Sequence, residues 1–240
     1  MASDTETASW PLFEAYPQLR ERLGPVSLGL WPTAVEAQPW PGLELWLKRD
    51  DLSGLRYGGN KVRKLEFLLA DAERKGRKEL WTVGAIGSHH CLATALYARA
   101  RGIDVHVLHF PQPVTEHVRR NLLAIGNTGA RLHLISREEL PAALLRQKIG
   151  SALRAQSMPY YIPGGGSNEL GVLAFVNAAF ELAEQVRAGV CPAPKSVVVA
   201  AGTCSTFAGL WLGSALSGLR YDTVGVRVVD RIVANTPLIK

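Results

Sequence analysis

Short apolar runs alternate with longer amphipathic stretches along most of the chain, beginning near Leu43. The short runs are rich in β-branched and aromatic residues and predict strands, whereas apolar residues at every third or fourth position predict helices. Strands are expected at 43–48, 79–83, 105–109, 131–134, 160–163, 196–200 and 223–229. Helices are expected at 61–74, 89–101, 115–124, 138–155, 170–188 and 206–216. This alternation predicts an α/β protein with parallel sheets, helices on both sheet faces and right-handed crossovers.

The two ends of the chain depart from this pattern. Residues 1–42 are rich in Pro and Trp and show little periodicity, so we expect an irregular arm with one short helix at 12–23. At the other end, the pattern stops at Lys240 soon after the start of what resembles another βα unit. This ending indicates a fragment of a longer protein or a shortened relative.

Composition and charge narrow the class of protein. The chain has 240 residues, of which 47% are apolar and 20% charged, as in a globular protein with an ample core. Lys and Arg outnumber Asp and Glu by 27 to 21, but they are scattered, which argues against a nucleic-acid partner. The three cysteines, Cys91, Cys191 and Cys204, lack metal-ligand spacing and favour a reducing cytoplasm over a disulfide framework.

One uncharged segment, Ser196 to Leu219, is long enough to span a bilayer. It is full of Gly, Ser and Thr and begins with three valines, so a buried strand, a turn and a buried helix explain it better. The polar, acidic start of the chain is not typical of a signal peptide. We therefore expect no membrane partner.

Three glycine-rich turns connect predicted strands to predicted helices, where backbone N–H groups favour anions. The first, 53–64, places Lys61 at a helix start, where the dipole and desolvation would lower its pKa and make it a better nucleophile. A surface lysine in a basic first turn, beside Arg63 and Lys64, fits the same residues.

The second turn, 84–91, places Ser88 at a helix N-cap, which capping alone explains; beside a ligand it would also contribute a hydroxyl. A metal at His89 and His90 is disfavoured, since adjacent helical residues point apart and no further ligand is near in sequence. The third turn, 201–206, fits a phosphate cradle and simple turn chemistry about equally well. Neither dinucleotide-binding nor Walker spacing is present.

Taken together, the motifs resemble a known family. The segment Lys48-Arg49-Asp50-Asp51-Leu52, followed by Gly58-Gly59-Asn60-Lys61-Val62-Arg63-Lys64-Leu65-Glu66, resembles the D-cysteine desulfhydrase and 1-aminocyclopropane-1-carboxylate deaminase family. Weaker motifs follow in the expected order at 83–88, 162–168 and 202–209, so the resemblance runs from about Pro25 to the end. It implies a pyridoxal-phosphate enzyme with the tryptophan-synthase-beta-like fold, known as fold type II.

The resemblance also implies roles. Residues 1–63 with 166–240 would form a large cofactor-binding domain, incomplete at its C-terminus, and 64–165 a small α/β domain. The expected activity is that of a lyase or deaminase acting on a small amino acid in amino-acid metabolism, in a cytoplasmic protein that could form a homodimer. Lys61 would hold pyridoxal 5'-phosphate as a Schiff base and shuttle protons, and Ser88 would be the second catalytic residue. Further cofactor contacts would come from Asn60, His89, Gly202, Thr203, Cys204, Ser205 and Thr206, and no metal is expected.

Three departures from the family pattern qualify these implications. His89 stands where the family commonly has Asn, and Cys204 replaces a common Gly, which requires a negative φ or a side chain pointing away from the phosphate. Family members also continue beyond the position of Lys240, with groups that face the pyridine nitrogen and the substrate. The alternative is therefore a truncated relative, non-catalytic or weakly active, that binds the cofactor or an amino acid. A nucleotide-dependent α/β enzyme is a third hypothesis, supported only by the βα pattern.

Overall fold

The structure is a computed structural model that describes residues 10–54, 56–136, 138–153 and 158–229. The chain divides into two compact units. The first contains the residues up to 67 and those from 168 onward, and the second contains residues 68–167. The chain passes from the first unit into the second within helix α3 (Lys61–Arg74). The sequence-based domain boundaries lay after residues 63 and 165, and the assignment of cofactor binding to the larger domain stays a prediction.

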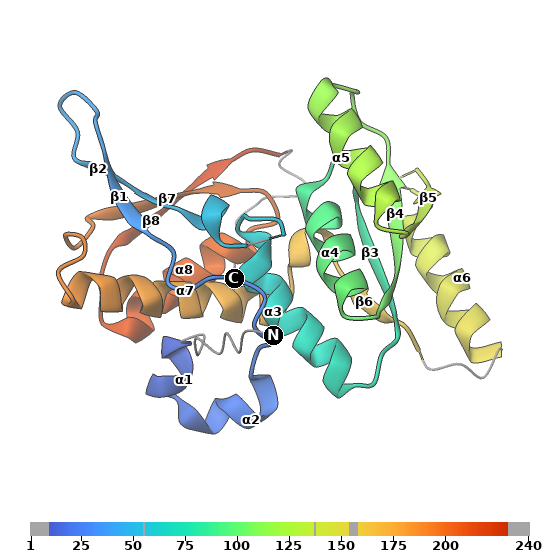
Figure 1. The fold of residues 1–240 in the computed structure, drawn as a ribbon, viewed down its shortest axis with the longest axis horizontal. Coiled ribbons are helices and arrows are strands. Elements are labelled where there is room, and N and C mark those ends of the chain that lie inside the picture. The colour runs from blue at the N-terminus through green and yellow to red at the C-terminus, as the bar shows by residue number, and fades with distance from the viewer. Residues whose placement is uncertain (1–9, 55, 137, 154–157, 230–240) are drawn as a thin grey trace, which may run out of the picture. The chain divides into compact units, whose positions relative to one another are not determined.

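The second unit is built on a four-stranded parallel sheet of order β5-β4-β3-β6. The chain adds β4 and then β5 on one side of β3, and returns to add β6 on the other side. Because all these crossovers have the same handedness, α4 and α5 cover one face of the sheet and α6 covers the other (Figure 1). Every residue from Val105 to His109 is buried, as expected for a strand covered on both faces. The bounds are β3 (Glu79–Ala85), α4 (His89–Ala100), β4 (Asp104–Phe110), α5 (Glu116–Asn127), β5 (Arg131–Leu134), α6 (Leu140–Leu153) and β6 (Tyr160–Ile162).

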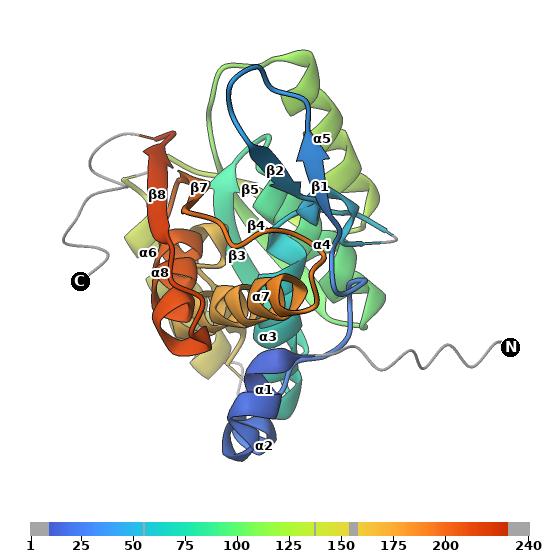
Figure 2. The same cartoon turned by 90° about the vertical axis from the view of Figure 1, so that its left-hand side faces the viewer.

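The first unit contains a parallel pair, β7 (Ser196–Ala201) and β8 (Asp222–Arg227), joined by helix α8 (Ser205–Ser217). Helix α7 (Glu169–Arg187) lies against α8 (Figure 2). Two glycines of α8 make this approach possible, because a Cβ on Gly209 or Gly213 would lie about 2.5 Å or less from Phe175 or Ala179. On α1 (Pro11–Ala15), Leu12 packs against α7, and Phe13 packs on Phe67 of α3.

The N-terminal arm is more ordered than the sequence predicted. Within 1–42, β1 (Val35–Gln38) pairs antiparallel with β2 (Leu45–Lys48), so the expected irregular arm and wholly parallel pairing are wrong here. The segment Val35–Gln38 reads Val-Glu-Ala-Gln, and Glu and Ala are uncommon in strands, so its composition gives little strand signal. The helix expected at 12–23 is divided into α1, a 3₁₀ turn (Pro17–Leu19) and α2 (Arg20–Leu23). It breaks at Tyr16 because a following proline disfavours α-helical backbone.

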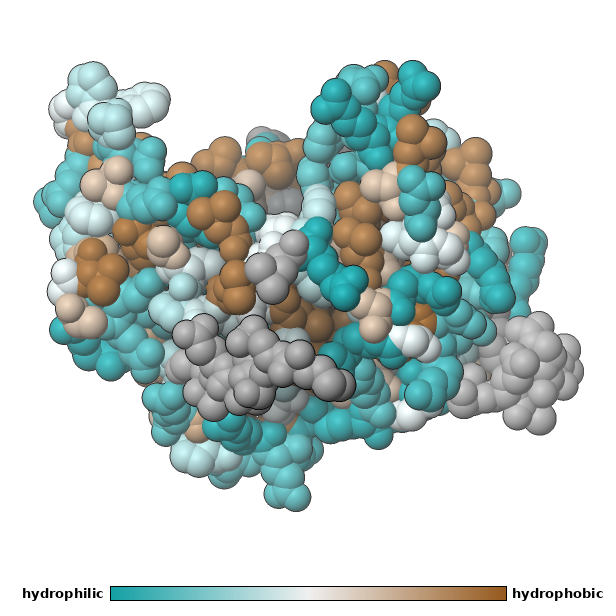
Figure 3. All heavy atoms as spheres, in the orientation of Figure 1, coloured by the Kyte–Doolittle hydropathy of each residue, from teal (hydrophilic) through white to brown (hydrophobic). Residues whose placement is uncertain are grey.

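The uncharged segment from Ser196 forms β7, a turn and α8 in the order that the sequence indicated, but the expected burial of the strand is wrong, because only Ala201 of β7 is buried. No helix in the described part of the chain is long and apolar enough to cross a membrane. On β7 and β8, Val198 and Val226 are 65% and 52% exposed, which leaves β-branched side chains facing outward. Figure 3 shows apolar side chains reaching the surface at several separate places on the face drawn.

Candidate active site

Lys61 is the first residue of α3, and the turn before it is tightly held. The backbone N–H of Gly59 donates to the carbonyl of Asp50 at 2.7 Å and to Ser53 Oγ at 3.1 Å. A Cβ on Gly58 would lie 1.8 Å from the carbonyl oxygen of Asp51, and Gly59 has a φ of +116°, so both glycines are required. Asn60 is half-buried immediately before the helix. The turn therefore gives Lys61 a defined starting position.

The amine of Lys61 is poorly solvated. Desolvation by burial lowers its pKa to about 8, from an ordinary lysine value of about 10.4. Near neutral pH this raises the fraction of neutral, nucleophilic amine by more than two orders of magnitude.

Lys64, one helical turn after Lys61, is more deeply buried, at 1% exposure. Its Nζ donates to Ser205 Oγ at 2.6 Å and lies 5.6 Å from the centroid of the Phe175 ring. Burial, and next the charge of Lys61, lower the pKa of Lys64 well below its ordinary value. Sequence reasoning missed this residue, although the spacing of three does place it on the same helix face as Lys61.

The third glycine-rich segment, 201–206, runs from the end of β7 through a short loop into the first two residues of α8, which begins at Ser205. Ser205 and Thr206 are buried, Gly202 is half-buried and Thr203 is exposed. Cys204 is buried in the left-handed conformation with a φ of +63°, so the negative φ considered from the sequence is wrong. Its thiol lies 3.9 Å from the carbonyl oxygen of Gly202. The first turn of α8 presents N–H groups and a positive dipole end toward this loop, which suits an anion.

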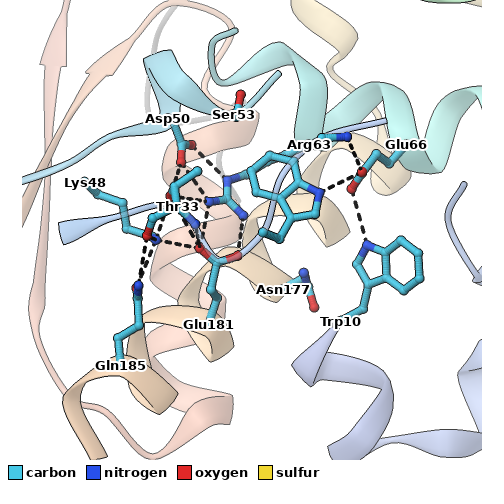
Figure 4. A network of polar contacts seen from close by, with 12 residues as sticks. Trp10, Thr33, Lys48, Asp50, Ser53, Arg63, Glu66, Asn177, Glu181 and Gln185 are labelled. Carbon is cyan, nitrogen blue, oxygen red and sulfur yellow. Dashed lines mark hydrogen bonds and ion pairs between the residues drawn. The ribbon is translucent and has the colours of Figure 1, made fainter. Parts of the chain in front are cut away.

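A buried ionic network holds one flank of α3 (Figure 4). Arg63 donates to Glu181 Oε2 at 2.8 Å and to Asp50 Oδ1 at 2.7 Å, and Lys48 donates to Glu181 Oε1 at 2.5 Å. The side chains of Arg63 and Glu181 are each 3% exposed. Burial alone would raise the pKa of Glu181, but Arg63 and Lys48 hold it at about 2. This network keeps the carboxylate ionised inside the first unit.

Glu66 anchors α3 to the N-terminal arm through four N–H donors. The backbone N–H groups of Leu28 and Gly29 and the indole Nε1 atoms of Trp31 and Trp10 lie 2.7–3.3 Å from its carboxylate oxygens. At about 100° per residue, Arg63 and Glu66 project from the side of the helix opposite Lys61 and Lys64. The two anchors therefore fix the rotation of α3 and the direction of both lysines.

In the second unit, the turn between β3 and α4 carries Ser88 and His89. Ser88 is the N-cap of α4, and its Oγ accepts from the N–H of Cys91 at 3.3 Å. A Cβ on Gly84 would lie 2.8 Å from Ser88 Oγ, and one on Gly87 would lie 2.8 Å from Val118 Cγ2, so both glycines give room. The predicted capping position of Ser88 is confirmed.

The adjacent histidines diverge, as expected from the helical geometry. His89 is exposed, whereas His90 is buried, and its Nε2 lies 2.9 Å from Thr82 Oγ1. Because Thr82 donates its proton to the carbonyl of Ile162, His90 Nε2 is the donor in that contact. The sequence places no further histidine near the His89–His90 pair, but the fold brings His117 beside His89 from α5, at 2.7 Å between Nε2 atoms.

The match to protein families defines the class. The model of the family described as "Pyridoxal-phosphate dependent enzyme" matches residues 26–238, and the chain belongs to this family. Its fold is the tryptophan-synthase-beta-like fold that the sequence predicted, and its cofactor class is pyridoxal phosphate rather than a nucleotide.

Individual relatives are more specific. The chain is 37% identical over 218 residues to the mitochondrial bifunctional D-cysteine desulfhydrase/1-aminocyclopropane-1-carboxylate deaminase of Arabidopsis thaliana, covering 85% of this chain and 54% of that protein. It is 39% identical over 205 residues to D-cysteine desulfhydrase of Serratia proteamaculans, covering 83% and 61%. The structure of an ACC deaminase homologue superposes with a TM-score of 0.77 at 34% identity, covering 89% of this chain and 65% of that one. The chain thus spans a little over half the length of the curated relatives.

Proposed function

We propose that this chain carries the lysine and phosphate-binding parts of a pyridoxal-phosphate-dependent lyase or deaminase for a small amino acid, such as D-cysteine or 1-aminocyclopropane-1-carboxylate. The observation that carries the proposal is the pair of desolvated lysines on one face of α3. The second of them, Lys64, donates a hydrogen bond to Ser205 at the start of α8. An aldehyde and a phosphate are the two groups of the cofactor that such a pair would recognise.

The residues present fit the cofactor. Lys61 offers an amine that is neutral in a useful fraction near neutral pH, as attack on an aldehyde requires. Lys64 is a buried base beside the N-terminus of α8, where a phosphate dianion would favour its protonated form. When bound, pyridoxal phosphate supplies a ring that accepts electrons from the substrate α-carbon.

The other roles follow from position. Lys61 Nζ, once released, would take a proton from the substrate and return it. Ser88 Oγ and the first turn of α4 would orient the substrate carboxylate. We assign Asn60 and His89 to the cofactor's ring, and Gly202, Thr203, Cys204, Ser205 and Thr206 to its phosphate.

The first experiment asks which lysine bonds to the cofactor. After addition of pyridoxal phosphate and reduction with borohydride, peptide mass analysis should locate the cofactor on Lys61. Lys61→Ala should lose the visible absorption band. Lys75→Ala is the control, because that exposed lysine, which follows α3, pairs with Asp71 and lies over the ring of Tyr160, both in the second unit. A band that survives Lys61→Ala would refute the proposal.

The second experiment separates the two roles of Ser88. Ser88 and Thr115 cap neighbouring helices with hydrogen bonds of the same length, 3.3 Å. Replacing either by Ala should cost about 1 kcal/mol of stability. Only Ser88→Ala should reduce turnover of D-cysteine or 1-aminocyclopropane-1-carboxylate, by about a hundredfold, a size typical of a positioned acid–base or orienting group. Equal activity of the two variants would remove Ser88 from the site.

We also propose a reducing compartment such as the cytoplasm, and a homodimer. The three cysteines are unpaired and buried, which supports the first. The second rests on the family resemblance, and sedimentation of the purified protein tests it.

A further inference from the structure

A hydrogen-bonded chain of three side chains and one carbonyl joins the starts of α4 and α5. His89 Nε2 lies 2.7 Å from His117 Nε2, with the ring centroids 4.7 Å apart and the planes tilted by 37°. His117 Nε2 also lies 3.3 Å from Asn121 Nδ2, which donates to the carbonyl of Gly87 at 2.9 Å. Asn121 is only 7% exposed. The chain therefore begins on a buried amide and ends on the exposed His89.

The buried end sets the direction of every hydrogen bond. Gly87 presents a carbonyl oxygen, which can only accept, so the amide nitrogen of Asn121 must face it. That nitrogen has a second proton and no lone pair, so its contact with His117 Nε2 requires a lone pair on the imidazole. In the remaining contact, His89 Nε2 must then carry the proton.

We infer that His117 is a positioning residue, which together with Asn121 fixes the tautomer and ring orientation of His89. With the proton held on Nε2, the neutral imidazole of His89 has its lone pair on Nδ1. An exposed histidine without such a partner would rotate and exchange between tautomers. The assignment of His89 to the cofactor's ring rests on the proposed function. The hydrogen-bonded chain from Gly87 to His89 does not depend on it.

The location supports a role at a site. Both helices begin at the carboxyl ends of parallel strands, β3 and β4, which is the edge where α/β proteins bind ligands. His89 directly follows the N-cap Ser88, and the carbonyl that orients Asn121 belongs to the residue directly before it. The hydrogen bonds thus connect two residues of the turn, Gly87 and His89, which flank Ser88, the other candidate residue of this unit.

The first test observes the hydrogen bonds directly in protein without cofactor. Nitrogen-15 NMR of the imidazole rings should show a protected Nε2–H on His89 and scalar coupling between the two Nε2 atoms. Under His117→Ala both signals should vanish. Under His117→Gln the protected proton should persist, because the amide oxygen accepts in place of the imidazole, while the coupling is lost. Free exchange of the His89 ring proton in the wild type would overturn the inference.

The second test measures the consequence in the cofactor-loaded protein. His117→Ala should lower kcat/KM about tenfold, as expected for one lost hydrogen bond, and should shift the cofactor's absorption band. His117→Gln should restore both, and Glu116→Ala, an exposed neighbour on α5, should change neither. An unchanged spectrum and activity in His117→Ala would refute the positioning role. Failure of the wild type to bind pyridoxal phosphate would refute the proposed function instead and leave the NMR result to decide the tautomer.

Discussion

The two candidate turns are held by different kinds of interaction. The Lys61 turn in the first unit depends on charged groups. Arg63 and Lys48 form ion pairs with the carboxylates of Asp50 and Glu181. Glu66 accepts hydrogen bonds from the N-terminal arm. The turn from Gly84 to His89 in the second unit depends on neutral groups. His109 belongs to the neutral set, since its Nδ1 lies 3.2 Å from the carbonyl oxygens of Gly84 and Ala85.

This difference affects the response to mutation. Removal of one ion from a buried network leaves its partner uncompensated, whereas a neutral hydrogen bond can be lost at a modest cost. The two cations and two anions around Arg63 also balance in formal charge. The pKa of Lys61 is accordingly lowered by burial and not by a neighbouring excess of positive charge. We therefore expect single substitutions to lower the free energy of unfolding by a large amount in the first unit and by a modest amount in the second.

The largest effect should come from breaking the buried network. Arg63→Met should lower the free energy of unfolding by about 3–5 kcal/mol, because the carboxylates of Asp50 and Glu181 would be left with only Lys48 as a counter-charge in the network. The matched control is Arg101→Met, which loses only the half-exposed ion pair with Glu73 and should cost about 0–1 kcal/mol. Urea unfolding measures both, and similar losses in the two variants would contradict the comparison.

A second effect should be stabilising. The folded protein binds the Lys61 proton less tightly than the unfolded chain, so the free energy of unfolding rises as pH increases from about 8 to about 10.4. Below that range the folded state bears the full cost of the charged amine. Lys61→Met should then raise stability near pH 7 by about 2–3 kcal/mol and flatten the alkaline part of the profile. A Lys75→Met variant should retain the wild-type profile.

In the second unit, the free energy of unfolding should change with pH at lower pH than the Lys61 effect, and by a smaller amount. Burial lowers the pKa of His106 and of His133, whose rings stack with Trp81 across three strands. His106 also faces Arg131 at 3.0 Å. The unfolded chain takes up protons first as pH falls below about 6.5, so stability is full above that value and declines below it. The loss should stay under about 1 kcal/mol because the rings are partly screened. Substituting both histidines by Gln should reduce the decline and leave the part due to His109, whose pKa burial also lowers, as thermal unfolding at several pH values would show.

The smallest effect concerns backbone strain in the first unit. Cys204→Gly should stabilise the protein by only about 0.5 kcal/mol, because glycine adopts a positive φ without the penalty of a Cβ but loses more backbone entropy on folding. Cys204→Ala keeps the Cβ and should give no such gain. Unfolding midpoints distinguish the two, and an equal change in both variants would attribute the effect to the thiol instead.

The sequence predicted the second unit well because its buried parallel strands are short runs rich in apolar and β-branched residues, as in β3 and β4. It placed Lys61 and Ser88 at helix starts from turn patterns alone. It could not predict contacts between distant residues, such as Lys64 with Ser205 or His89 with His117, because these depend on how helices pack. The sign of φ at Cys204 was equally inaccessible, since a residue type only biases its backbone conformation.

The anchoring of Glu66 has an optical consequence. Trp10 and Trp31, two of the six tryptophans, donate their indole N–H groups to this one carboxylate, and the Arg63 guanidinium lies 4.0 Å from the Trp31 ring. Indole emission depends on nearby charge and hydrogen bonding. The protein thus contains an intrinsic fluorophore at the start of the helix that carries Lys61, and loosening of that helix should change the colour of its fluorescence before the whole chain unfolds.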